Sequence, residues 1–171
     1  QVAYCQINMR WNDKPYHTLD YELKRKYGEK IYKIALDANM TCPNRDGSCG
    51  VRGCIFCSAG GSGDFAAKDT SIARQLEQGK QYFRNKKVGE RFIAYFQSYT
   101  NTYAPVPTLE ALYREALENS TVVGISIATR PDCLGSDILA LLDRLNREYT
   151  DKFIWIELGL QTIHEHTATL I

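Results

Sequence analysis

The 171-residue sequence lacks three features that would place it quickly in a class of protein. It has no apolar run long enough to cross a bilayer, so we expect no membrane-spanning helix and no membrane partner. It has no basic segment followed by an apolar stretch near Gln1, so we expect no secretory signal peptide. Its net charge is only +1, which argues against a protein that coats nucleic acid generally.

Cysteine, by contrast, is abundant, with six residues in the chain. Cys42, Cys49, Cys54 and Cys57 lie close together, and Cys5 and Cys133 lie apart from them. A disulfide framework would usually spread its cysteines over a small, loop-rich chain. The clustering therefore favours a metal or iron–sulfur site in a reducing cytoplasm. From the residues alone, zinc and iron–sulfur are equally compatible with the spacing.

Hydrophobic patterns predict strands that alternate with helices along the chain. Apolar, β-branched and aromatic runs predict strands at residues 30–37, 91–98, 122–129 and 153–161. Helical spacing predicts helices at residues 21–27, 69–87, 108–119, 136–149 and 162–171. We expect Asp69 or Thr70 to cap the second helix and Pro107 to precede the third.

This alternation predicts an α/β fold with a parallel sheet and right-handed crossovers. We expect a partial barrel of the TIM type over residues 29–171, incomplete after four strands, with residues 1–28 as an N-terminal extension. In such folds the chemistry lies beyond the carboxyl ends of the strands. The loop at residues 38–68 follows the first strand and holds the four clustered cysteines, so it lies on that side.

Several motifs in this chain occur in a combination that is specific. The cysteine loop contains CPNRDG and GCIFC, and the run into it reads YGEKIYKIALDANMT. ATRPD follows the third strand, and IELGLQT lies at the fourth. Together these segments resemble the radical S-adenosylmethionine (SAM) superfamily, in its Elongator-catalytic-subunit-like branch and the YhcC-type bacterial group. The resemblance covers nearly the whole chain and implies a radical SAM core.

The resemblance implies that Cys42, Cys54 and Cys57 hold a [4Fe–4S] cluster. Three thiolates leave one iron without a protein ligand, and SAM would chelate that iron. A one-electron reductant of the flavodoxin or ferredoxin type would supply the electron that cleaves SAM to methionine and a 5′-deoxyadenosyl radical. Cys49 departs from the pattern, and a bystander, a transient fourth ligand and a zinc ligand all stay open.

The resemblance also implies residues that contact SAM from the loops near the cluster. Phe56 would pack beside the adenine, although ordinary core packing is an alternative. Gln97 and Asn101, in the segment FQSYTNT after the second strand, would contact the methionine amino group. The alternative for both is a polar loop that caps the next element.

Three further residues lie at the ends of the later strands. Arg130 follows the third strand, where it would pair with a carboxylate, or else form a structural ion pair with Asp132. Glu157 lies within an apolar strand, so we expect it inside the barrel with a partner. By resemblance, Glu157 and Gln161 would face the cofactor ribose or the substrate.

The resemblance places tRNA first among the substrate classes, because characterised members of this branch act on the wobble uridine of tRNA. That step depends on family analogy. One alternative is a radical SAM enzyme that acts on a small molecule. The other is a zinc-binding interaction domain without enzymatic activity.

Overall fold

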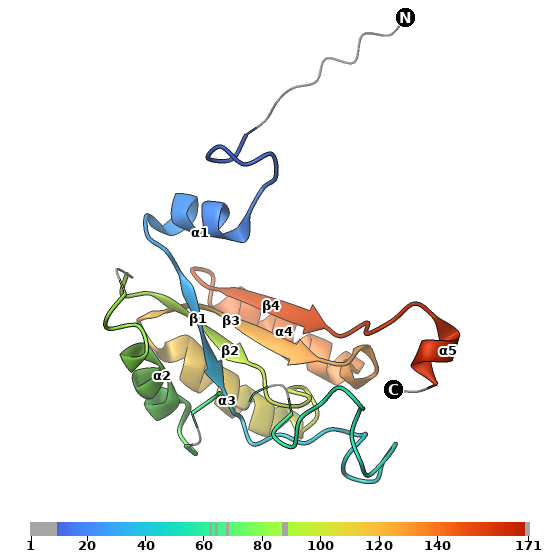
Figure 1. The fold of residues 1–171 in the computed structure, drawn as a ribbon. Helices are drawn as coiled ribbons and strands as arrows, with labels where there is room; N and C mark the ends of the chain where they lie inside the picture. Colours follow the sequence, from blue (N-terminus) through green and yellow to red (C-terminus); the bar gives the residue numbers. More distant parts are fainter. Residues whose placement is uncertain (1–9, 62, 64, 68, 87–88, 170–171) are drawn as a thin grey trace, which may run out of the picture.

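The computed structural model describes residues 10–61, 63, 65–67, 69–86 and 89–169. Within them, helices and strands alternate after the first helix (Figure 1). Their order is α1 (Leu19–Tyr27), β1 (Tyr32–Leu36), α2 (Ile72–Gln81), β2 (Phe92–Phe96), α3 (Val106–Glu118), β3 (Val122–Thr129), the 3₁₀-helix η1 (Pro131–Cys133), α4 (Ser136–Glu148), β4 (Phe153–Leu158) and α5 (Glu165–Ala168). None of the described helices has the length and apolarity to cross a membrane.

The four described strands form one sheet in the order β1-β2-β3-β4, and every pair is parallel. This confirms the expected α/β fold with a parallel sheet. Parallel strands need crossover connections, and helices α2, α3 and α4 supply them between successive strands. The carboxyl ends of all four strands therefore lie at one edge of the sheet, where the cysteine loop begins (Figure 1).

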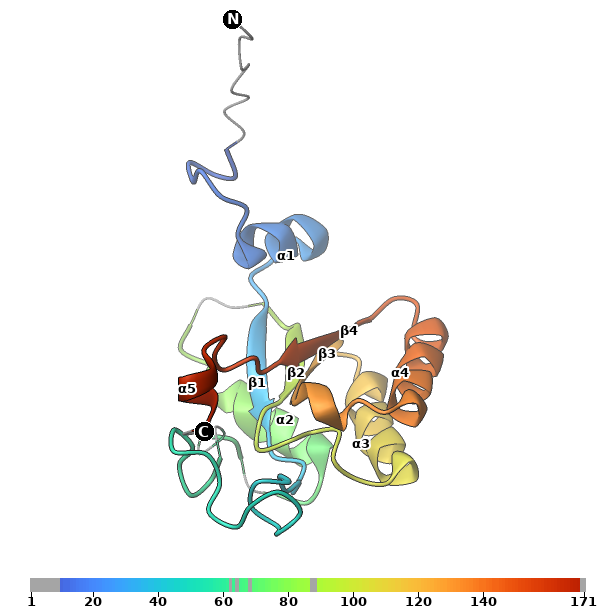
Figure 2. The same ribbon diagram turned by 90° about the vertical axis from the view of Figure 1, so that its right-hand side faces the viewer.

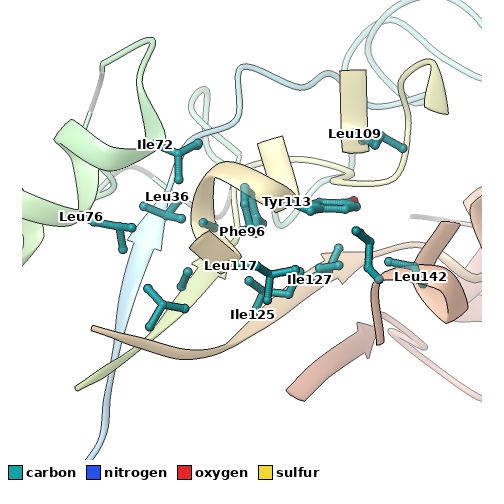
Figure 3. Close-up of a cluster of buried hydrophobic side chains, with 14 of the residues drawn as sticks. Leu36, Ile72, Leu76, Phe96, Leu109, Tyr113, Leu117, Ile125, Ile127 and Leu142 are labelled. Atoms are coloured by element: carbon teal, nitrogen blue, oxygen red, sulfur yellow. The ribbon is translucent and has the colours of Figure 1, made fainter. Parts of the chain in front are cut away.

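Helices α2, α3 and α4 cover one face of the sheet, and the main hydrophobic core lies between them and the strands (Figure 2). Figure 3 shows Tyr113 and Leu117 of α3 packed near Phe96, Ile125 and Ile127 of the strands. These five side chains are at most 1% exposed. The Tyr113 hydroxyl is satisfied in this core by the bond that it donates to a backbone carbonyl.

Helix α1 packs near the amino ends of the strands, on the face that the other helices leave open (Figure 1). Its Leu23 is buried against Ile31, Ile93 and Val123. The helix ends as the sequence predicts, because Gly28 adopts the left-handed conformation that a helix C-cap requires (φ 75°).

The second predicted helix, at residues 69–87, is wrong at both ends. The N-cap is Ser71, whose hydroxyl accepts a hydrogen bond from the Arg74 N–H. Asp69, one of the two expected caps, instead uses its carboxylate to accept a bond from the Ser71 N–H. The helix ends at Gln81, and the predicted end at Lys87 lies outside the described residues.

Several other predicted boundaries also differ. Helix α3 begins at Val106, so Pro107 lies in its first turn. Proline is tolerated there because backbone N–H groups in the first turn have no hydrogen-bond partner within the helix. The last strand ends at Leu158, because Gly159 follows it and Gln161 has a positive φ of 63°. The expected helix at residues 162–171 is limited to α5 within the described residues, and Ile171 lies outside them.

Leu141→Ala tests the core between α4 and the sheet. Leu141 is 1% exposed, so its truncation leaves a cavity and should lower the free energy of unfolding by about 2–5 kcal/mol. Leu139→Ala is the matched control on the same helix, because Leu139 is 49% exposed and should cost less than about 0.5 kcal/mol. Urea unfolding of both variants checks the difference. Equal losses of stability would contradict the packing described here.

Candidate functional site

The cysteine loop connects β1 to α2 and is folded by its own backbone hydrogen bonds. The Cys42 carbonyl accepts bonds from the N–H groups of Arg45 (2.8 Å) and Asp46 (3.2 Å), which close a tight turn. The Asn44 carbonyl accepts a bond from Gly53 N–H at 2.8 Å, which brings the second half of the loop back to the first. Gly53 has φ 75°, and a Cβ there would lie 2.8 Å from the Arg45 guanidinium. The loop therefore requires glycine at this point.

A cavity of about 540 Å³ lies beyond the carboxyl ends of the strands. Its walls come from the cysteine loop, the loop after β2, and the ends of β3 and β4. The lining residues are Cys42, Asn44, Arg45, Gly53, Cys54, Phe56, Cys57, Gly61, Tyr99, Thr100, Ala128, Thr129, Arg130, Pro131, Asp132, Glu157, Leu158, Gly159 and Gln161. Its size falls in the range of cavities that bind cofactors and other small ligands.

Most of the residues that sequence analysis selected meet in this cavity. Seven line it: Cys42, Cys54, Phe56, Cys57, Arg130, Glu157 and Gln161. They come from segments that are far apart in the sequence. The parallel sheet brings them together because each lies at the carboxyl end of a strand or in the loop after it.

Gln97 and Asn101 do not line the cavity. Asn101 is 1% exposed, and its amide nitrogen donates to the carbonyls of Phe96 and Ala128, both at 3.1 Å. Asn101 thereby ties the end of β2 to the end of β3. Gln97 is half-buried, and its N–H donates to the Leu36 carbonyl. The same segment reaches the cavity through other residues, Tyr99 and Thr100.

Arg130 forms the ion pair with Asp132 that the sequence left open, and it also points toward the cysteines. Two guanidinium nitrogens contact the two carboxylate oxygens of Asp132 at 2.9 and 2.6 Å. This pairing raises the pKa of Arg130 and lowers that of Asp132. The third nitrogen, Nη1, donates to the Asn44 Oδ1 at 2.7 Å and lies 3.8 Å from the Cys42 Sγ.

The thiols in the cavity have different environments. Burial raises the pKa of Cys42, but hydrogen bonds from Thr100, the Asn44 N–H and Arg130 outweigh it, so the pKa lies below the ordinary value. Burial and the neighbouring Cys54 raise the pKa of Cys57. The thiolate is the form that binds metals, and the surroundings of Cys42 favour that form.

The described residues contain no group of three His, Cys, Asp or Glu side chains placed to hold one metal ion. Cys42, Cys54 and Cys57 all line the first cavity. A structural zinc site has its four ligands at tetrahedral positions around one ion. In an iron–sulfur cube each cysteine binds a different iron, so the thiols lie around the cluster.

Cys49 and Cys133 line a second cavity, of about 640 Å³, which lies beside the first. Asp132 belongs to the walls of both cavities. Cys49 is exposed, and Cys133 is half-buried. Cys49 is therefore outside the cavity that holds the other three loop cysteines. Cys5 lies outside the described residues.

A polar cluster lies on the open face of the sheet, and Glu157 connects it to the first cavity. The Glu157 carboxylate forms an ion pair with Lys33 and accepts a bond from the Ser126 hydroxyl. The Lys33 ammonium also lies 4.2 Å from the centre of the Tyr95 ring. Burial raises the pKa of Glu157, but the bonds from Lys33 and Ser126 outweigh it and lower the pKa. Burial and Glu157 raise the pKa of Tyr95 to about 12.

Several residues of the site were not predicted from the sequence. Asn44 and Arg45 belong to the CPNRDG motif, in which only Cys42 was given a role from the sequence. Lys33 lies in an apolar strand, where an isolated charge signals a partner of opposite charge. That signal was present in the sequence, whereas the identity of the partner, Glu157, depends on the fold.

No protein-family model matches this chain. Uncharacterized protein YtqA of Bacillus subtilis is 49% identical over 160 residues, which cover 93% of this chain and 49% of the relative. Protein YhcC of Escherichia coli K12 is 41% identical over 148 residues, 85% of this chain and 46% of the relative. Uncharacterized protein MJ0486 of Methanocaldococcus jannaschii is 35% identical over 153 residues, which cover 87% of this chain and 45% of the relative. The chain thus spans about half the length of these curated relatives, and their names state no activity.

Glu157→Gln tests the polar cluster through the pH dependence of stability. The folded-state pKa of Glu157 lies below the ordinary value of 4.5, so its ion pair stabilises the fold above that pH. This contribution is lost as the pH falls through the folded-state pKa. Glu157→Gln should therefore melt at a lower temperature than the parent protein near neutral pH, and the difference should shrink below about pH 4.5. Thermal unfolding across this range checks it, with the exposed Glu90→Gln as control. A difference that does not change with pH would contradict the assignment.

Proposed function

We propose that this chain carries the cluster-binding part of a radical SAM enzyme, in which Cys42, Cys54 and Cys57 hold a [4Fe–4S] cluster. The observation that supports it best is the meeting of these three thiols in one cavity beyond the carboxyl ends of a parallel sheet. The motifs in the cysteine loop, ATRPD and IELGLQT support the same proposal. Because the chain spans about half of its curated relatives, the activity proposed is that of the whole protein.

The donor set fits such a cluster. Thiolates are soft ligands that suit iron–sulfur clusters, and three of them come from one loop. Cys49, the other cysteine of that loop, lines a different cavity. Three protein ligands leave one cluster iron open to a small molecule. When bound, the cluster would supply the electron that cleaves SAM to methionine and a 5′-deoxyadenosyl radical.

The chain's own residues would bind and orient SAM around the cluster. The Phe56 ring is 52% exposed at the wall of the cavity, so it offers an apolar surface on which an adenine would stack. Glu157 and Gln161 reach the cavity from the end of β4 and offer polar groups to a ribose. Arg130 is held by Asp132 and Asn44. We therefore propose that Arg130 interacts with the thiols and does not bind the SAM carboxylate.

We propose tRNA as the substrate class and the wobble uridine as the site of modification. This step rests on the resemblance to the Elongator-like branch. The alternative substrate class is a small molecule.

Anaerobic reconstitution with iron and sulfide tests the cluster. We expect the full-length protein to take up about four irons per chain and to form 5′-deoxyadenosine from SAM with a one-electron reductant. Alanine at Cys42, Cys54 or Cys57 should remove most of the iron and the product. The controls Cys49→Ala and Cys133→Ala should keep both, because those thiols line the second cavity. Stoichiometric zinc with no iron, or a cluster that survives replacement of all three cysteines, would reject the proposal and favour a zinc-binding domain.

A profile of modified nucleosides tests the substrate class. We expect tRNA from a strain that lacks the gene to lose a wobble-uridine modification. The gene for the parent protein should restore it, and the gene for Cys54→Ala should not. An unchanged profile, together with formation of 5′-deoxyadenosine by the purified protein, would instead favour a small-molecule substrate.

A further inference from the structure

Asn44 connects the cysteine loop to the loop after β3 through both ends of its side-chain amide. Its Nδ2 lies 3.0 Å from the Cys54 Sγ, and its Oδ1 lies 2.7 Å from the Arg130 Nη1. The residue is half-buried in the wall of the first cavity. No role for Asn44 follows from the cysteine spacing.

The orientation of this amide is determined by its neighbours. An arginine guanidinium has donors and no acceptor, so the Asn44 oxygen must face Arg130. The amide nitrogen must then face Cys54 and donate to its sulfur. The two neighbours therefore distinguish the oxygen of this amide from its nitrogen.

Asp132 holds the other end of this network. Its carboxylate binds two guanidinium nitrogens of Arg130, which leaves Nη1 directed at Asn44 and at the Cys42 Sγ, 3.8 Å away. Donors from one network therefore reach two of the three thiols in the cavity. The link runs from the loop after β3 to both halves of the cysteine loop.

We propose that Asn44 is a positioning residue that donates a hydrogen bond to the Cys54 thiolate and raises the reduction potential of the cluster. The inference rests on the proposed function, because it needs a cluster at these thiols. Hydrogen bonds to the sulfurs stabilise the reduced state more, since that state places more negative charge on them. Asn44 also holds Cys54 at a defined place relative to Cys42, because Arg130 contacts both Asn44 and Cys42.

Two substitutions separate the parts of this role. Asn44→Asp keeps an oxygen for Arg130 but has no donor for Cys54. Asn44→Ala removes both contacts without adding charge. Asn39→Asp is the matched control, because it adds the same charge at an exposed position that does not line the cavity.

The experiment is a redox titration of the reconstituted full-length proteins, followed by electron paramagnetic resonance of the reduced cluster. At a fixed potential, both Asn44 variants should show a ratio of reduced to oxidised cluster about tenfold lower than the parent, a midpoint shift of about 59 mV to lower potential. Asn39→Asp should match the parent protein.

The outcomes separate this inference from the proposed function. If the parent protein assembles no [4Fe–4S] cluster, both fail. If it assembles one and the Asn44 variants share its midpoint, only the inference fails. If neither variant retains iron while both apo-proteins melt at the parent's temperature, the positioning role is supported. If the apo-proteins melt well below it, Asn44 is a structural residue and the inference is overturned.

Discussion

Parallel pairing of the four strands is the constraint on which the rest of the structure depends. It requires a crossover connection between successive strands, and it sends every strand-to-helix loop to the same edge of the sheet. The cysteine loop, the Tyr99–Thr100 segment, Arg130 and Glu157 meet at that edge although they are far apart in the sequence. The site is therefore a consequence of the direction of the strands.

The two faces of the sheet have different chemistry, and this difference leaves room for the site. Three helices bury one face in a continuous apolar core. On the other face, α1 covers the beginning of the strands, and the Lys33–Glu157 ion pair follows further along. β1 and β4 would be about 14 Å apart in a flat sheet, so an ion pair between them indicates that the sheet curves toward this face. Such curvature is what a partial barrel requires.

Charge at the site is organised around the thiols. Arg130 brings a cation near Cys42, and the Asp132 carboxylate, which lines both cavities, balances that cation. A guanidinium beside thiolates lowers the cost of bringing several negative sulfurs together. Arg45 adds a second cation, whose guanidinium lies 5.3 Å from the centre of the Tyr99 ring at the same wall. Both cations lie at the wall that Cys42, Cys54 and Cys57 also line.

The sequence by itself determined the order of the strands and helices along the chain, because apolar periodicity reports which face of an element is buried. Motifs that resemble a known family also selected seven of the residues that line the cavity. They meet there because the ends of parallel strands lie at one edge of the sheet. The sequence misplaced the ends of α2 and the end of the last strand, because the Ser71 cap and a positive φ at Gln161 determine the start of α2 and the end of β4.

Only the tertiary structure decided how the side chains pair. In it, Asn101 connects the ends of β2 and β3 through hydrogen bonds, and Cys49 lines a different cavity from the other loop cysteines. It also showed that Asn44 bridges Cys54 and Arg130. These contacts join residues as many as 86 positions apart. The spacing of residues in the sequence does not predict these side-chain contacts, because they depend on how the whole chain packs.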